Sequence, residues 1–168
     1  MASGHEVTGR CLCGAVRYRA ALKNLEIGAC HCSMCRRWSG GPLLGVEPDG
    51  AVAFDNEEQI SAYRASEWGE RGFCRQCGTN LFWRMKDGSH VVLCAGTLDD
   101  ASGLRLTTEI FIDEKPAYYD FANETNKLTG QQVFEMFAPE QETGGGQWPR
   151  LKRKSAISRS ISGRSTRR

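Results

Sequence analysis

The sequence predicts a mainly β fold, built from antiparallel sheets with little helix. Short segments with strand composition recur between turn residues along the chain. Alternation is clearest over residues 15–19, where Val16 and Tyr18 would face one side and the intervening arginines the other. That pattern is typical of a strand with one buried face. Helical periodicity is confined to two short segments.

The expected strands follow one another through the body of the chain. They are the segments 15–19, 42–46, 51–54, 59–63, 80–83, 90–93 and 108–112. A helical turn is expected to begin at Ser33, because serine is a favoured N-cap residue. Residues 131–137 carry apolar side chains at helical intervals and predict one further helix. We expect no internal repeat and no second domain.

The charges divide the chain into a body and a tail. Residues 150–168 carry eight of the 22 Lys and Arg residues and none of the 20 Asp and Glu residues, so a basic tail follows a net acidic body. The tail lacks an apolar period and follows the glycine run 144–146, which is typical of a flexible hinge. We therefore expect a folded domain over 1–142 and a disordered, Ser/Arg-rich tail over 143–168. A solvated tail is the favoured interpretation, with contact to nucleic acid through phosphate groups as the alternative.

The sequence shows neither an export signal nor a membrane span. Residues 1–6 contain no basic segment followed by an apolar stretch, and no apolar run approaches the roughly 20 residues that a membrane helix needs. We therefore expect a cytoplasmic protein with no membrane partner. Thiols stay reduced in that compartment, so clustered cysteines indicate metal binding or catalysis before they indicate cross-links.

Seven of the eight cysteines fall into three tight clusters: Cys11-x-Cys13, Cys30-x-Cys32-x-x-Cys35 and Cys74-x-x-Cys77. Thiols so close in sequence do not easily pair with each other as unstrained disulfides. On a turn, however, they direct two sulfurs at one point, which suits a tetrahedral thiophilic metal ion such as zinc. A closed structural site needs four ligands and a catalytic site keeps one position open, so we divide the clusters as four plus three.

The two doublets together predict a closed structural zinc site. Its expected ligands are Cys11, Cys13, Cys74 and Cys77. Glycines 14 and 78 follow the doublets, as expected where the backbone must turn tightly beside the sulfurs. Such a site would contribute folding free energy directly.

The triplet predicts a catalytic zinc site, in which Cys30, Cys32 and Cys35 hold the ion and carry the chemistry. Three thiolates leave a weak Lewis acid, but such a centre still lowers the pKa of a bound external thiol, which favours thiol–aldehyde chemistry over hydrolysis. His31 would point away from the sulfurs in an extended segment, which favours a supporting or packing role. Cys94 is expected to be a buried apolar thiol. The alternative, Cys94 as a fourth ligand, would make a closed scaffold without a reactive metal.

Three motifs in this order resemble the glutathione-dependent formaldehyde-activating enzyme family, which also includes centromere protein V. They are Gly9-Arg10-Cys11-Leu12-Cys13-Gly14-Ala15-Val16, Cys30-His31-Cys32-Ser33-Met34-Cys35-Arg36-Arg37 and Phe73-Cys74-Arg75-Gln76-Cys77-Gly78-Thr79-Asn80-Leu81. The likeness covers roughly residues 8–121. The resemblance implies an Mss4-like, mostly β fold, with a structural zinc on the two doublets and a catalytic zinc on the triplet.

The resemblance also implies a carbon–sulfur lyase that adds glutathione to formaldehyde and gives S-(hydroxymethyl)glutathione. Another small thiol or aldehyde is an alternative substrate. Arg36, Arg37 and Arg64 could pair with the carboxylates of glutathione, although solvated surface arginines are the simpler interpretation. Trp38 and Trp83 could line a pocket or simply pack in the core. The alternative function is a non-enzymatic, zinc-stabilised binding module with a tail that contacts nucleic acid.

Overall fold

The computed structural model describes residues 4–137 of the 168-residue chain. β-Strands are the predominant regular structure of this part. The strands are β1 (His5–Arg10), β2 (Arg17–Leu22), β3 (Glu26–Cys30), β4 (Leu43–Val46), β5 (Ala53–Asp55), β6 (Ile60–Arg64), β7 (Gly69–Cys74), β8 (Asn80–Met85), β9 (Val91–Cys94), β10 (Arg105–Ile110) and β11 (Asn126–Leu128). The described residues also include two α-helices, α1 (Ser33–Ser39) and α2 (Gly130–Phe137). Three 3₁₀ turns are present as well: η1 (Glu57–Gln59), η2 (Ala95–Thr97) and η3 (Ile112–Glu114). The tail expected over 143–168 lies outside the described residues.

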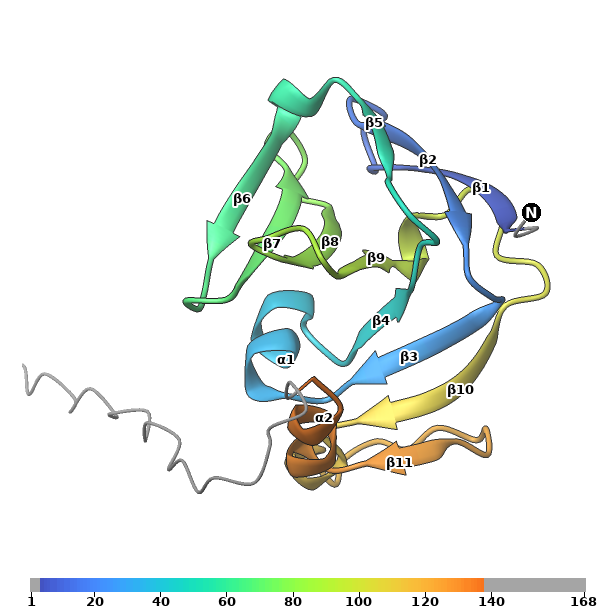
Figure 1. The fold of residues 1–168 in the computed structure, drawn as a ribbon, viewed down its shortest axis with the longest axis vertical. Helices are drawn as coiled ribbons and strands as arrows, with labels where there is room; N and C mark the ends of the chain where they lie inside the picture. Colours follow the sequence, from blue (N-terminus) through green and yellow to red (C-terminus); the bar gives the residue numbers. More distant parts are fainter. Residues whose placement is uncertain (1–3, 138–168) are drawn as a thin grey trace, which may run out of the picture. The chain divides into compact units, whose positions relative to one another are not determined.

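The strands form two sheets (Figure 1). One has three antiparallel strands in the order β1-β2-β5. The other has eight strands in the order β11-β10-β3-β4-β9-β8-β7-β6. Its neighbours pair antiparallel except that β10 runs parallel to both β3 and β11. The predicted mainly β, largely antiparallel architecture is confirmed, and the parallel pairs are a feature that the sequence did not indicate.

The core lies between the two sheets and obeys the alternation read from the sequence. In β2 the side chains of Tyr18, Ala20 and Leu22 are buried, while Arg17 and Arg19 face solvent. The Tyr18 hydroxyl keeps a polar partner inside the core, since it lies 2.6 Å from Thr97 Oγ1. Phe82 packs directly over Gly72, where an added Cβ would lie 2.2 Å from its ring. This close approach explains a glycine in the middle of β7.

All seven expected strands occur, with ends shifted by up to three residues. Four further strands, β1, β3, β7 and β11, were not predicted. β7 shows why, because its sequence Gly-Glu-Arg-Gly-Phe-Cys carries two glycines and two charges and has no apolar alternation. It is nevertheless a strand, since β6 and β8 pair with it on both sides.

The two expected helices are present, but the cap of the first differs from the prediction. α1 begins at Ser33, yet its N-cap is Cys32, whose Sγ accepts a hydrogen bond from Cys35 N at 3.4 Å. The prediction that Ser33 caps this helix is therefore wrong, because a thiol of the triplet takes that position. α1 ends at Gly40, which adopts the left-handed conformation with a φ of 73°. Within residues 4–137 no helix is long and apolar enough to cross a membrane.

Candidate metal centres

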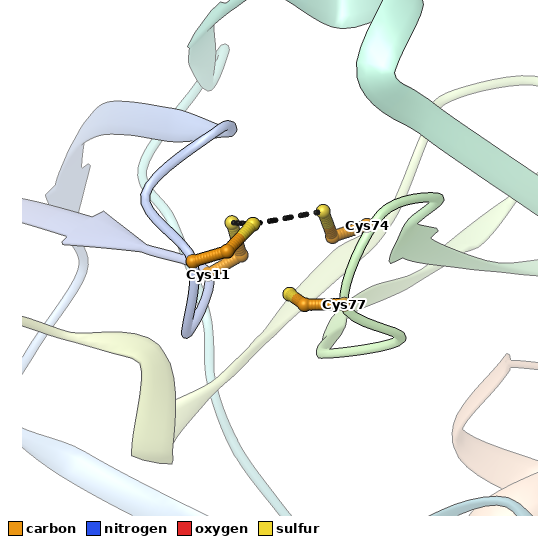
Figure 2. Close-up of side chains that lie close together, drawn as sticks. Cys11, Cys74 and Cys77 are labelled. Carbon is orange, nitrogen blue, oxygen red and sulfur yellow. Dashed lines mark hydrogen bonds between the residues drawn. The ribbon is translucent and has the colours of Figure 1, made fainter.

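Two turns bring the four cysteines of the doublets together (Figure 2). One turn connects β1 to β2 and carries Cys11 and Cys13, while Cys74 and Cys77 lie at the end of β7 and in the turn that follows. The four Sγ atoms all lie within 4.8 Å of one another, with 3.5 Å between Cys11 and Cys13. Cys13 and Cys74 are 3.8 Å apart. A tetrahedral ion with metal–sulfur bonds of about 2.3 Å requires sulfurs roughly 3.8 Å apart, so this set fits one zinc ion.

The backbone forms tight turns around these cysteines. Gly14 and Gly78 have φ values of 77° and 74°, which residues with a side chain rarely adopt. Their amides close the two turns by donating to the carbonyl oxygens of Cys11 and Cys74 at 3.1 and 2.8 Å. Val16 N donates to Cys11 Sγ at 3.3 Å. The glycines expected after each doublet therefore shape the turns, and a neighbouring amide contacts the sulfur.

The triplet forms a second, separate set. Cys30 ends β3, Cys32 caps α1 and Cys35 lies in the first turn of α1. Their Sγ atoms also lie within 4.8 Å of one another. Cys32 and Cys35 are 7% and 5% exposed, whereas Cys30 is partly exposed. The set therefore offers three thiol ligands.

Hydrogen bonding among the three thiols favours negative charge in the triplet. The hydrogen bonds from Cys30 and then Cys35 lower the pKa of Cys32 to about 2. The same contact to the Cys32 sulfur raises the pKa of Cys30 far above its ordinary value. A sulfur whose pKa is lowered in this way suits metal ligation, and a bound metal ion would displace the protons of the thiols.

Cys94 lies in the same buried cluster as Cys32 and Cys35, but outside the set of three mutually close sulfurs. It is 8% exposed, and burial raises the pKa of its thiol to about 12. A neutral, buried thiol agrees with the interpretation of Cys94 as a small apolar side chain. Within residues 4–137 the triplet thus has no fourth thiol at ligand distance.

Several apolar side chains surround the triplet. Those packed against its buried cluster are Met34, Trp38, Trp83 and Phe111. Phe111 has a φ of 56°, an unusual conformation for an aromatic residue. Both tryptophans considered as pocket residues therefore lie beside the triplet. They would limit the access of water to the sulfurs.

The three arginines considered as partners of the glutathione carboxylates lie on α1 and on β6. Arg36 Nε donates to the carbonyl oxygen of His31 at 2.8 Å, and Arg37 is exposed. Arg64 lies on the far strand β6, where its Nε is 3.5 Å from Glu70 Oε2. The prediction from the sequence did not include Arg71. This residue is 3% exposed, and its Nη2 lies 3.9 Å from Cys35 Sγ.

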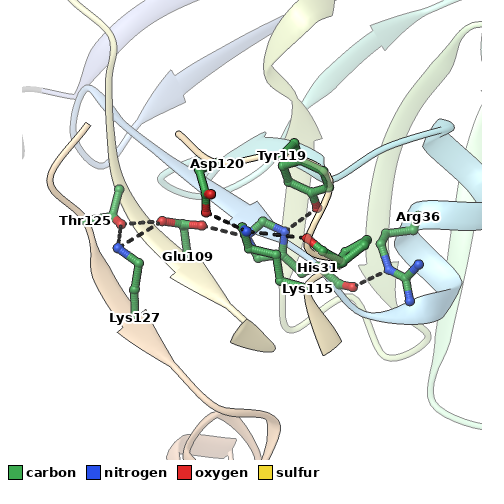
Figure 3. Close-up of polar contacts among 9 residues, drawn as sticks. His31, Arg36, Glu109, Lys115, Tyr119, Asp120, Thr125 and Lys127 are labelled. Carbon is green, nitrogen blue, oxygen red and sulfur yellow. Dashed lines mark hydrogen bonds and ion pairs between the residues drawn. The ribbon is translucent and has the colours of Figure 1, made fainter. Parts of the chain in front are cut away.

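His31 lies between two cysteines of the triplet but directs its ring into a different polar network (Figure 3). Its Nε2 lies 2.9 Å from Glu109 Oε2, and its Nδ1 lies 2.7 Å from the Tyr119 hydroxyl. An ionised carboxylate only accepts hydrogen bonds, so Nε2 carries the proton in the pair with Glu109. Both ring nitrogens are therefore engaged away from the sulfurs.

Glu109 is the centre of this network, although it is only 1% exposed. Thr125 Oγ1 donates to its Oε1, and Lys127 Nζ lies 3.5 Å from the same oxygen. Burial would raise the pKa of Glu109, but the hydrogen bonds from Thr125 and His31 outweigh it and hold the pKa below its ordinary value. A glutamate inside the apolar strand Thr-Glu-Ile-Phe-Ile was the signal in the sequence that could have indicated a buried partner.

One family model and several known proteins are similar to this chain. A family model described as glutathione-dependent formaldehyde-activating enzyme matches residues 6–114. An uncharacterised lyase of Schizosaccharomyces pombe is 30% identical over 131 residues, which cover 77% of this chain and 96% of that protein. A putative glutathione-dependent formaldehyde-activating enzyme of Halomonas elongata is 32% identical over 83 residues, or 44% of this chain and 53% of that protein. A crystal structure of a Rhodobacter sphaeroides protein has a TM-score of 0.49 and 22% identity, and covers 58% of this chain and 90% of that one.

Proposed function

The chain belongs to the glutathione-dependent formaldehyde-activating enzyme family, and on that premise we propose that it is a zinc-dependent carbon–sulfur lyase. Its substrates would be a small thiol and a small aldehyde, with glutathione and formaldehyde as the first pair to test. The observation that carries the proposal is the division of seven cysteines into a set of four and a set of three. Because the proposal requires reduced thiols, we expect the protein to act in the cytoplasm.

Each set has its own role in this proposal. The doublets, Cys11, Cys13, Cys74 and Cys77, would hold a structural zinc ion with all four positions filled. The triplet, Cys30, Cys32 and Cys35, would hold a catalytic zinc ion. A zinc ion bound there would supply the acidity that converts an incoming thiol to its thiolate near neutral pH.

The reaction exchanges a carbon–oxygen π bond for a carbon–sulfur bond and transfers one proton. In the synthetic direction the carbon–sulfur bond forms between the thiol and the carbonyl carbon as the π bond of the carbonyl group breaks, and the carbonyl oxygen takes up the proton that the thiol gives up. In the lyase direction the adduct loses its hydroxyl proton, the carbonyl π bond re-forms as the carbon–sulfur bond breaks, and the thiol regains the proton. The reactants would approach the triplet beside Cys30, which is partly exposed, whereas Cys32 and Cys35 are buried. The buried side of the triplet, next to Trp38 and Trp83, would keep bulk water away.

Exchange NMR with labelled formaldehyde and glutathione at equilibrium tests the proposal. The interconversion rate is measured without protein, with the wild type, with Cys32→Ala and with Cys94→Ala. Thiols add to formaldehyde unaided, so only the excess over the protein-free rate counts. Cys94→Ala is the matched control because it removes a buried thiol from the same cluster without touching the set of three.

The proposal predicts excess exchange with the wild type and Cys94→Ala, and exchange at the protein-free rate with Cys32→Ala. No excess exchange with wild-type protein that carries two zinc ions would contradict glutathione and formaldehyde as the substrates. Loss of exchange in Cys94→Ala together with loss of one zinc ion would contradict the open triplet and favour a closed site with four thiolates.

A further inference from the structure

Arg71 is a buried cation without a carboxylate partner. Its side chain is 3% exposed, and its Nε is a buried nitrogen with no hydrogen-bond partner. Within residues 4–137 it forms no ion pair with an acidic side chain. A charge in such a position is strongly unfavourable unless an opposite charge lies nearby.

The adjacent carboxylate cannot serve, because it faces the other side of the sheet. Glu70 precedes Arg71 in β7, and successive side chains of a strand point to opposite faces. Glu70 is itself engaged by two other arginines, Arg84 at 2.6 Å and Arg64 at 3.5 Å. The arginine of β7 thus requires a different counter-charge, on the face that α1 covers.

On that face Arg71 contacts the triplet. Its Nη2 lies 3.9 Å from Cys35 Sγ, and its guanidinium carbon lies 5.7 Å from the centre of the Trp38 ring. Both partners belong to α1, so the arginine joins β7 to the helix that carries Cys35 and is capped by Cys32. The contact to Trp38 supplies cation–π attraction, which does not replace an anion.

We propose that Arg71 is the counter-charge of the triplet metal centre and positions the Cys35 thiolate. Three thiolates around a divalent ion carry one net negative charge, which matches the single positive charge of the guanidinium. The arginine would draw electron density from Cys35 and so make the bound ion a stronger acid toward an incoming thiol. This inference rests on the proposed occupancy of the triplet by a divalent ion.

The role of Arg71 is tested by metal release. Full-length protein is first loaded with two equivalents of Zn²⁺ or Co²⁺ under reducing conditions. A chromogenic chelator is added in excess, and the release of the two ions is followed as two phases. Cys32→Ala identifies the phase that belongs to the triplet. The phase of the four-cysteine set serves as the internal reference, and the cobalt–thiolate absorption reports directly on the ligands.

The decisive variants are Arg71→Met and Arg71→Lys. Methionine keeps an apolar stem against Trp38 and removes the charge, whereas lysine keeps the charge. We expect Arg71→Met to speed release from the triplet by about 10-fold or more, as loss of a partner to a metal ligand does, and to shift the cobalt–thiolate band. Arg71→Lys should recover most of the wild-type rate. Arg64→Gln, which removes an arginine that is 74% exposed, should release both ions as the wild type does.

A purely structural role predicts a different outcome. If Arg71 only filled space, methionine would leave release from the triplet and the cobalt spectrum unchanged, and that result in protein with two bound ions would overturn the inference alone. If Arg71→Met fails to fold, Arg71→Gln takes its place with the same expected result. Wild-type protein that retains one ion, in the four-cysteine set only, would overturn the proposed function and this inference with it.

Discussion

His31 and Glu109 are 78 positions apart, yet their side chains meet at 2.9 Å with almost no exposure to solvent. The contact links two parallel neighbours, because β10 runs beside β3 with Ile110 opposite Cys30. His31 N also donates to the Ile110 carbonyl oxygen at 3.0 Å. The backbone that carries Cys30 and Cys32 is therefore fixed to β10 through both main-chain and side-chain contacts.

Replacing Glu109 with alanine should destabilise the protein strongly. The change leaves the buried His31 Nε2 without an acceptor and removes the partner of Thr125. We expect the free energy of unfolding to fall by about 3 kcal/mol, the size typical of a broken buried polar pair. Denaturant titration of the zinc-loaded protein measures this change.

Glu109→Gln is the matched control, because it keeps the shape and one acceptor oxygen while removing the charge. It should lose less stability than Glu109→Ala. Equal stability of the wild type and Glu109→Ala would show that the network does not hold β3 against β10.

The four-cysteine set should be essential for folding. Cys74 is fully buried, and its sulfur joins the end of β7 in the large sheet to the turn between β1 and β2. We expect Cys74→Ala to be insoluble or to lack fixed side-chain packing, because a structural zinc site contributes folding free energy directly. Solubility, near-ultraviolet circular dichroism and metal content measure the effect.

Cys94→Ala provides the comparison, since it removes an equally small buried side chain outside both sets. It should stay soluble and melt cooperatively. A soluble, cooperatively melting Cys74→Ala protein would contradict the assignment of Cys74 to a structural metal site.

Stability in acid should depend on Glu70. The hydrogen bond from Arg84 and the charges of Arg84 and Arg64 hold the pKa of Glu70 below its ordinary value despite its burial. Its contribution to stability is therefore complete above the unfolded-state pKa of about 4.3 and is lost as the pH falls through the lower folded-state pKa. We expect Glu70→Gln to cost about 1–2 kcal/mol at neutral pH and progressively less below pH ~4.

Urea unfolding of the wild type and of Glu70→Gln at each pH measures the difference in their free energies of unfolding. Because the two proteins are compared at the same pH, any destabilisation by metal release that affects both of them cancels. Glu67→Gln, at an exposed position nearby, should match the wild type at every pH. A Glu70→Gln difference that stays constant between neutral pH and pH ~3 would rule out the linkage.

Catalysis should not need the basic tail. The seven clustered cysteines all lie within residues 11–77, and the family match ends at residue 114. We expect a protein truncated after Glu142 to keep the excess exchange rate of the full chain. Salt-dependent binding to DNA or RNA, measured by anisotropy, should decrease if the tail contacts phosphate groups. A truncated protein that folds and binds two zinc ions but loses exchange would show that the tail takes part in the reaction.

The parts of the fold that the sequence predicted are those in which local pattern and final environment agree. β2 is one example, since its alternation already separates buried from exposed side chains. The proximity of the sulfurs within each cysteine cluster is another, because their close spacing directs them at one point. The structure brings Cys11 and Cys13 to Cys74 and Cys77, and it keeps Cys94 apart, as the division into four plus three requires.

The parts that the sequence did not predict depend on partners far along the chain. β7 could not be recognised from its sequence, because Glu70 and Arg71 are buried only through contacts with other strands and with α1. The parallel pairing of β10 with β3 needs a long connection, which leaves no local signal. The cap of α1 was misplaced by one residue because a serine is the better cap in isolation, whereas here the thiol of Cys32 fills that position.

The distance along the chain between the two doublets has a consequence for biosynthesis. Cys13 and Cys74 are 61 positions apart, so at translation rates of roughly 5–20 residues per second the first doublet emerges from the ribosome about 3–12 s before the second. The triplet, by contrast, spans only residues 30–35 and is complete as soon as that segment emerges. A nascent chain therefore presents three clustered thiols to the cellular zinc supply before the site that joins its two sheets can form.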